Sequence, residues 1–170
     1  MRSMDFSWTD EQILWRKTVR EFAQKKIKPK IRDIDTTKKI PEVILKEMGK
    51  LGLLAPTVSQ EHGGADLDWI MACIAAEELG RADISLAIPV LYLVEAAWGF
   101  ILNRYGSSHA KEKYLPQITS GNAFCGIAVT EPEGGSDIVG ATKTYAVQKG
   151  KDWILNGEKI FISGITESLN

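Results

Sequence analysis

The spacing of apolar residues divides the chain into two regions. Up to about residue 120, apolar positions recur every three or four residues, as on the buried face of amphipathic helices. Beyond Gly121 the pattern changes to two-residue alternation, which is typical of strands. The chain is therefore predicted to be α+β. We expect an all-α helical bundle of about five to six helices over residues 1–120, followed over 121–170 by the first strands of an incomplete antiparallel β-barrel or sandwich.

Capping and helix-breaking residues give the expected helix boundaries. Thr9 and Gln12 have the spacing of a capping box at the start of the first helix, and Pro29 is expected to kink or end it. A later helix is expected to be capped by Asp66 and to end at Gly80.

A long apolar helix is predicted to end at Tyr105. Its stretch 84–102 has about the length of a membrane span. Glu95 lies inside this stretch, however, and Pro89 and Gly99 interrupt it. A helix buried inside a bundle explains the pattern better, so we expect no membrane insertion.

Four strands are predicted in the second region, at 124–130, 142–149, 153–156 and 159–163. Gly150 and the Asn156-Gly157 pair are hairpin signals between them. A few strands without a partner sheet expose an edge and an apolar face. We therefore expect association through this exposed β edge, or a homo-oligomer.

The loop 131–137, with the sequence EPEGGSD, separates the first two of these strands. Pro132 fixes its own φ, and Gly134 and Gly135 permit positive φ. Successive backbone N–H groups in such a turn can hold a phosphate, with the Ser136 hydroxyl as a further donor. From the glycines alone, an ordinary strand–turn–strand connection is the better explanation, because Gly-Gly-Ser is a weak signal.

The residues around this loop resemble the signature of the acyl-CoA dehydrogenase family. Residues 128–137 are similar to the family pattern A-x-T-E-P-x-x-G-S-D, with matches at Thr130, Glu131, Pro132, Gly135, Ser136 and Asp137. A second block, 153–163, resembles W-x-L-N-G-x-K-x-W-I-T, with Phe161 and Ser163 in place of the Trp and the final Thr. The resemblance extends back through the helical region and so covers nearly the whole chain.

The resemblance implies FAD as cofactor and an acyl-CoA thioester as substrate. It assigns the flavin ring to Val129 and Thr130, the FAD pyrophosphate to Gly135 and Ser136, an aromatic wall to Phe161 and a hydroxyl near the reactive nitrogen to Ser163. Core packing on a strand is an equally good explanation of Phe161, and a strand-end hydroxyl explains Ser163. The acyl chain is assigned to the long apolar helix, at Val90, Leu93, Val94 and Ala97, although core packing is the better explanation of any one of them.

No catalytic residue is assigned. In the family, a glutamate from a C-terminal helical domain abstracts the substrate α-proton, and none of Glu131, Glu133, Glu158 and Glu167 fits that role by motif. We therefore interpret the chain as the N-terminal part of an FAD-dependent acyl-CoA dehydrogenase of fatty acid or amino acid catabolism, inactive by itself and binding FAD weakly or not at all. The alternatives are a fragment of a related flavoprotein oxidase or monooxygenase, and a non-enzymatic interaction module.

The net charge and the two cysteines bear on the expected partners and on the cellular compartment. The net charge of −1 does not favour nucleic acid as a partner. Cys73 and Cys125 lack metal-ligand spacing, so we expect no metal site and two buried, reduced thiols in a cytoplasmic protein.

Overall fold

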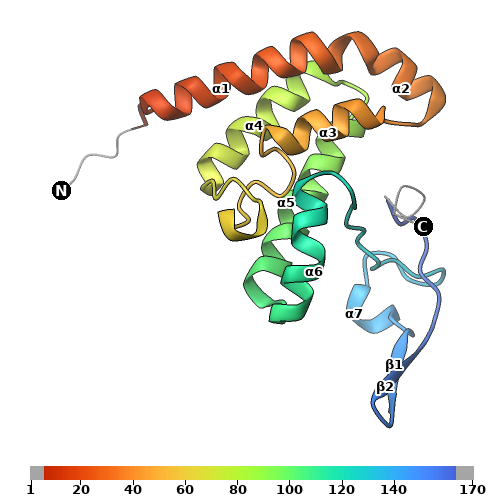
Figure 1. Ribbon diagram of the computed structural model, residues 1–170. Helices are drawn as coiled ribbons and strands as arrows, with labels where there is room; N and C mark the ends of the chain where they lie inside the picture. The colour runs from red at the N-terminus through yellow and green to blue at the C-terminus, as the bar shows by residue number, and fades with distance from the viewer. Residues whose placement is uncertain (1–5, 164–170) are drawn as a thin grey trace. The chain divides into compact units, whose positions relative to one another are not determined.

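The computed structural model describes residues 6–163, which fall into two units that divide between Cys125 and Gly126 (Figure 1). The first unit contains α1 (Asp10–Phe22), α2 (Ile31–Thr37), α3 (Glu42–Lys50), α4 (Trp69–Ala82), α5 (Ala87–Tyr105) and α6 (Ser108–Thr119). The second contains α7 (Ile138–Ala141), β1 (Tyr145–Lys149) and β2 (Asp152–Asn156). The predicted fold class is confirmed: the six helices of the first unit are followed, in the second unit, by the start of an antiparallel sheet.

The start of α1 has the predicted capping box. The Thr9 hydroxyl accepts the Gln12 N–H at 3.2 Å, and the Gln12 side-chain oxygen accepts the Thr9 N–H at 3.1 Å. The α-helical hydrogen bonding of α1 ends at Phe22, but the chain stays helical past Pro29. A five-residue π turn, Ala23–Ile27, and a 3-10 turn, Lys28–Lys30, lead directly into α2. These looser and tighter turns accommodate the missing N–H of the proline.

The predicted limits of α4 were wrong at both ends. Asp68, not Asp66, is the N-cap, because its carboxylate accepts the Met71 N–H at 2.8 Å. Asp66 instead has a left-handed φ of 53° in the preceding loop. The helix also continues past Gly80 to Ala82, since Gly80 has no positive φ that would end it.

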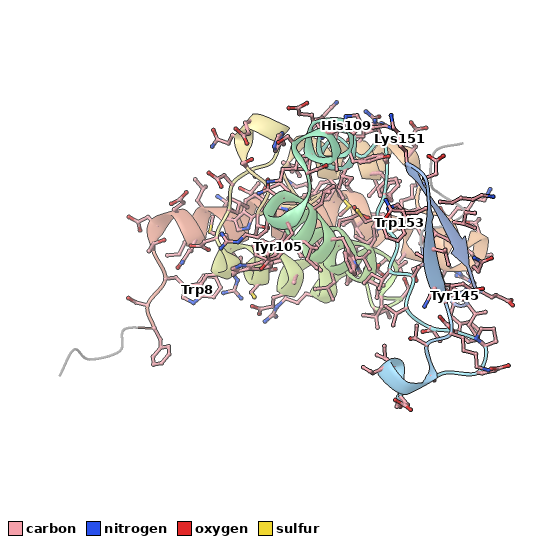
Figure 2. The ribbon with its side chains drawn as sticks, turned by 90° about the horizontal axis from the view of Figure 1, so that it is seen from below. Trp8, Tyr105, His109, Tyr145, Lys151 and Trp153 are labelled. Atoms are coloured by element: carbon pink, nitrogen blue, oxygen red, sulfur yellow. The ribbon has the colours of Figure 1, made fainter. Side chains whose placement is uncertain are left out.

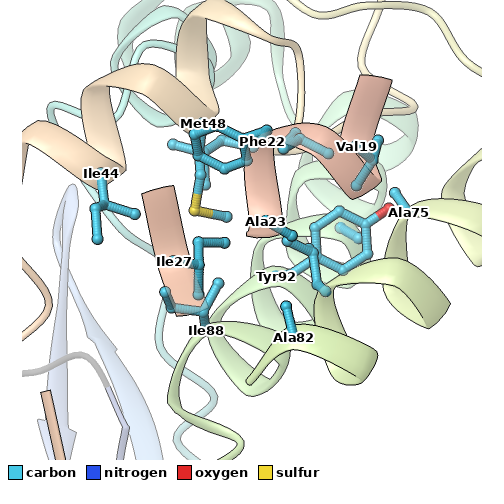
Figure 3. Close-up of a cluster of buried hydrophobic side chains, with 14 of the residues drawn as sticks. Val19, Phe22, Ala23, Ile27, Ile44, Met48, Ala75, Ala82, Ile88 and Tyr92 are labelled. Atoms are coloured by element: carbon cyan, nitrogen blue, oxygen red, sulfur yellow. The ribbon is translucent and has the colours of Figure 1, made fainter. Parts of the chain in front are cut away.

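Side chains from α1, α3, α4 and α5 form the main core of the first unit (Figure 3). Its buried members include Val19, Phe22, Met48, Ala75 and Tyr92. Tyr92 is buried with its hydroxyl satisfied, because it donates to the Ala72 carbonyl at 2.8 Å. This contact fixes α5 against α4. None of the helices within residues 6–163 combines the length and the hydrophobicity that crossing a bilayer requires.

A buried carboxylate joins α1 to α4. Glu78 is 2% exposed, and its oxygens lie 2.8 Å from Arg16 Nε and 2.7 Å from Arg20 Nη2. Hydrogen bonds from the Arg20 side chain, followed by Arg16, lower the pKa of Glu78 to about 2 despite its burial. The carboxylate is therefore charged and satisfied at neutral pH.

The two strands of the second unit form an antiparallel hairpin in which Val147 lies opposite Ile154. Every residue of both strands is exposed, including Tyr145 and Trp153 (Figure 2). A sheet of two strands has no partner layer to bury its faces.

The other two predicted strands, 124–130 and 159–163, are not formed within the described residues. Strands require a ladder of hydrogen bonds, and one backbone hydrogen bond, Ile160 N–H to Thr130 O at 2.9 Å, is formed between these segments. The strand predicted over 142–149 begins only at Tyr145, after the short helix α7 that the sequence did not predict. The Asp137 side chain caps α7 by accepting the Gly140 N–H at 2.9 Å.

We predict that Glu78→Gln destabilises the helical unit by about 2 kcal/mol, because two arginines lose their shared buried anion. Urea unfolding followed by circular dichroism at 222 nm measures this change. Glu77→Gln is the matched control, since the neighbouring Glu77 side chain is 44% exposed and its ion pairs contribute less than about 0.5 kcal/mol. Equal effects of the two variants would show that the buried carboxylate has no special role.

Candidate functional site

An ion pair joins Glu131, the first residue of the EPEGGSD loop, to Lys159 in the segment after β2. Lys159 Nζ lies 2.7 Å from Glu131 Oε1 and donates a second hydrogen bond to the Val129 carbonyl at 2.9 Å. The neighbouring Ile160 N–H donates to the Thr130 carbonyl at 2.9 Å. Segments 28 to 30 residues apart in the sequence are thereby held side by side.

The Glu131 carboxylate is the centre of this arrangement. It is 6% exposed and also accepts the backbone N–H groups of Lys143 and Thr144, at 2.7 and 3.0 Å. The hydrogen bond from Lys159 is the main cause that lowers the pKa of Glu131 to about 2. Glu131 therefore stays ionised at neutral pH and fixes the chain just before β1.

The loop itself is open. The Gly134 N–H donates to the Glu131 carbonyl at 3.0 Å, which closes the turn. A Cβ added at Gly134 would meet the Ala141 side chain at 3.0 Å, whereas a Cβ at Gly135 would meet nothing within 4 Å. Gly135 and Ser136 are both exposed, and no other described residue hydrogen-bonds the Ser136 hydroxyl.

A small hollow of about 10 Å³ lies under this loop, lined by Val129, Thr130, Glu131, Gly134, Gly135, Asp137, Ile138, Ala141 and Thr142. Val129 and Thr130, assigned to the flavin ring, and Gly135, assigned to the pyrophosphate, border this one hollow. Ser136, also assigned to the pyrophosphate, lies beside it on the same loop.

Part of the second family block, 153–163, lies against the first, 128–137. Lys159 and Ile160 contact the 129–131 segment directly, and a Cβ added at Gly126 would lie 3.1 Å from the Ser163 carbonyl oxygen. Ser163 is exposed. Phe161 is 89% exposed, so it is not a core residue of the described chain.

Phe161 also has an unusual backbone conformation. Its φ of 59° is in the left-handed region, which costs a bulky residue roughly 1–3 kcal/mol. Such strain occurs often at binding sites, where a side chain must be aimed in a particular direction. In this chain the strain accompanies an aromatic ring that is turned away from its own unit's interior.

The four residues assigned to the acyl chain share one face of α5. Val90, Leu93 and Ala97 are exposed and Val94 is half-buried, with the spacing of neighbours on a helix surface. The opposite face of α5 is buried in the core of the first unit, where Tyr92 lies. Packing in the core of the helical unit is therefore the wrong explanation for Val90, Leu93 and Ala97. These three residues form an apolar surface that is open to solvent in this unit.

Comparison with known proteins identifies the family. The model of the acyl-CoA dehydrogenase N-terminal domain matches residues 9–122, and that of the middle domain matches residues 126–168. The chain belongs to the acyl-CoA dehydrogenase family. It is 38% identical over 156 residues to an acyl-CoA dehydrogenase of Bacillus subtilis, an alignment that covers 91% of this chain and 40% of the relative. The human mitochondrial short-chain specific acyl-CoA dehydrogenase is 35% identical, with 98% of this chain and 40% of that protein covered.

Solved structures agree with this assignment. A glutaryl-coenzyme A dehydrogenase in complex with glutaryl-CoA has a TM-score of 0.89 and 34% identity, covering 97% of this chain and 42% of that one. A glutaryl-CoA dehydrogenase of Mycobacterium smegmatis in complex with FADH2 has a TM-score of 0.83 and 29% identity, covering 91% and 39%. The chain thus spans about 40% of the length of these family members.

Sequence reasoning missed the pairing of Glu131 with Lys159. A signal was present, since the first family block holds acidic residues and no basic one, and Lys159 is the one basic residue of the second block. The contact between Glu131 and Lys159 could not be inferred without the fold, because 28 residues separate them.

We predict that Lys159→Met loosens the contact between the two blocks. The backbone N–H groups of Lys143, Thr144 and Ile160 should exchange with solvent at least about tenfold faster, because the buried carboxylate loses its counter-charge. Amide hydrogen exchange followed by NMR measures this.

Lys143→Met is the matched control for this experiment. The Lys143 side chain is 71% exposed and pairs with Glu133 on the surface, while only its backbone contacts Glu131. We expect unchanged exchange in this variant. Similar acceleration in both variants would contradict a specific role for Lys159.

Proposed function

We propose that this chain is the N-terminal part of an FAD-dependent acyl-CoA dehydrogenase that carries out α,β-dehydrogenation of acyl-CoA thioesters. The supporting observation is the Lys159–Glu131 contact, which brings the two sequence blocks of the family together in one unit. In this proposal residues 1–120 are the helical N-terminal domain and residues 121–170 are part of the middle β-domain. A cytoplasmic location and homo-oligomerisation belong to the same proposal.

The residues around the loop fit a flavin cofactor. A flavin ring is flat and apolar with polar edges, so it requires an aromatic wall and a few donors. Phe161 offers an exposed ring, and Thr130 and Ser163 offer hydroxyl groups. Open space at Gly135, beside the exposed Ser136 hydroxyl, leaves room for a pyrophosphate to approach the backbone.

FAD, when bound, supplies the acceptor for the hydride that leaves the substrate β-carbon. The chain's own part is to bind and orient. Val129 and Thr130 would hold the ring edge, and Gly135 and Ser136 the pyrophosphate. The apolar face of α5 formed by Val90, Leu93, Val94 and Ala97 suits the hydrocarbon part of an acyl group, because it is open in the helical unit.

Glu131 does not serve as the base for the α-proton. Its carboxylate oxygens accept hydrogen bonds from Lys159, Lys143 and Thr144, and its pKa of about 2 is far below the value that suits proton abstraction near neutral pH. We therefore propose that the base lies outside the described residues, as it does in the family pattern.

We predict that millimolar FAD perturbs the amide NMR signals of Val129, Thr130, Gly135, Ser136 and Phe161, and that binding is weak. Ser136→Ala should weaken this binding about three- to tenfold, because one hydrogen bond to a phosphate is lost. Tyr145→Phe is the matched control, since it removes a hydroxyl group in the same unit from an exposed residue of β1 that does not line the hollow. Perturbations scattered over both units, or none, would contradict the proposed site.

We further predict that the chain with FAD, butyryl-CoA and an artificial electron acceptor shows no turnover, because we assign no base to the residues that the structure describes. Butyryl-CoA alone should perturb signals on the exposed face of α5. Measurable reduction of the acceptor would show that a base within these 170 residues had been missed.

A further inference from the structure

A third buried glutamate, Glu95, has no counter-charge among the described residues. Glu95 lies in the middle of α5 and is 0% exposed. Its Oε1 accepts the Cys125 backbone N–H at 2.9 Å, and its Oε2 is buried without a hydrogen-bond partner among the described residues. Glu78 and Glu131 are both paired with cations, but no ion pair is formed by Glu95 within residues 6–163.

Burial makes the Glu95 carboxyl a weaker acid than an exposed glutamate. It raises the pKa of Glu95 to about 7, although the hydrogen bonds from Cys125 act in the opposite direction. The titratable group that faces Glu95 is the Cys125 thiol, whose own pKa is raised to about 12 by burial and by the nearby Glu95 charge. Both groups are therefore neutral in mildly acidic solution.

Cys125, the hydrogen-bond partner of Glu95, lies at the boundary between the two units. Cys125 is where the first unit ends, and its half-buried side chain packs on the small core of Ala55, Val58, Leu115 and Ile118. Four residues later the chain reaches Val129, the first of the residues assigned to the flavin ring. One carboxyl on α5 thus holds the last residue of the helical unit.

We propose that Glu95 is a positioning residue: as a neutral acid it holds the Cys125 backbone on α5, and its ionisation releases this segment. An unpaired carboxylate cannot remain in an apolar interior, so ionisation requires that water reach it through local opening. The hold of Glu95 on Cys125 does not depend on the proposed function. Only its consequence for the flavin-binding residues, to which the held segment leads, rests on that function.

The sign of the pH dependence follows from the two states. The pKa is about 7 in the folded chain and 4.5 for an unperturbed glutamate. Between these values the folded state binds more protons than the unfolded state, so stability falls as pH rises from 4.5 to 7 and then levels off. Glu95→Gln removes this dependence, because an amide does not ionise.

The test compares the wild-type chain with Glu95→Gln and with Glu112→Gln, an exposed glutamate of α6 that serves as the matched control. Urea unfolding is measured at pH 5 and pH 8. Between these values, the unfolding equilibrium constant of the wild type and of the control should rise on the order of a hundredfold more than that of Glu95→Gln. The histidines, and all carboxylates except Glu95 and Glu112, are shared by the three chains and cancel in the comparison.

Amide exchange at Cys125 gives the second readout, which does not depend on the folding of a variant. After correction for intrinsic exchange, the protection of this amide in the wild type should fall at least about tenfold between pH 6 and pH 8. The pH midpoint of this fall should equal the midpoint of the Glu95 carboxyl titration, which ¹³C NMR measures separately.

Two results would overturn the proposal: the same pH dependence of stability in all three chains, or a Cys125 amide that stays protected while Glu95 ionises. Neither measurement uses flavin or acyl-CoA. Failure here therefore leaves the proposed function standing, and failure to bind flavin leaves the role of Glu95 standing.

Discussion

The Glu131 carboxylate is almost fully buried, and each hydrogen bond it accepts comes from a residue at least 12 positions along the chain. Its ammonium partner, Lys159, also donates to the Val129 carbonyl. A buried charge without partners would be strongly unfavourable, so the segments that supply the donors are held close to the carboxylate. In a unit with an exposed hairpin and few buried apolar residues, this polar contact determines the position of the loop.

The helical unit uses buried glutamates in two contrasting ways. Glu78 receives two arginines from α1 and is kept ionised, which adds a directional contact to a core already formed by apolar packing. Among the described residues, Glu95 receives a backbone N–H and no cation, so burial favours its neutral form. The same residue type therefore acts as a fixed anion or as a titrating group, according to the donors that surround it.

The sequence predicted features that depend on neighbours along the chain and missed those that depend on distant partners. The capping box of Thr9 and Gln12 involves residues three apart, and it was predicted correctly. Asp66 and Asp68 are equally good caps by composition, and only the loop conformation selects Asp68. The strand expected at 124–130 needs a hydrogen-bonding ladder that the described chain does not supply, and the Lys159–Glu131 contact is visible only after folding. The exposure of Leu93 likewise depends on what packs against α5.

Lys159 and Glu131 form a largely buried ion pair that joins the two family blocks. The most direct measurement is the pKa of the Glu131 side chain, followed by the ¹³C chemical shift of its carboxyl carbon as the pH is lowered. The ion pair predicts a midpoint near 2. A midpoint near 4.5, the value of an unperturbed glutamate, would contradict it, because the carboxylate would then have no close cation in solution.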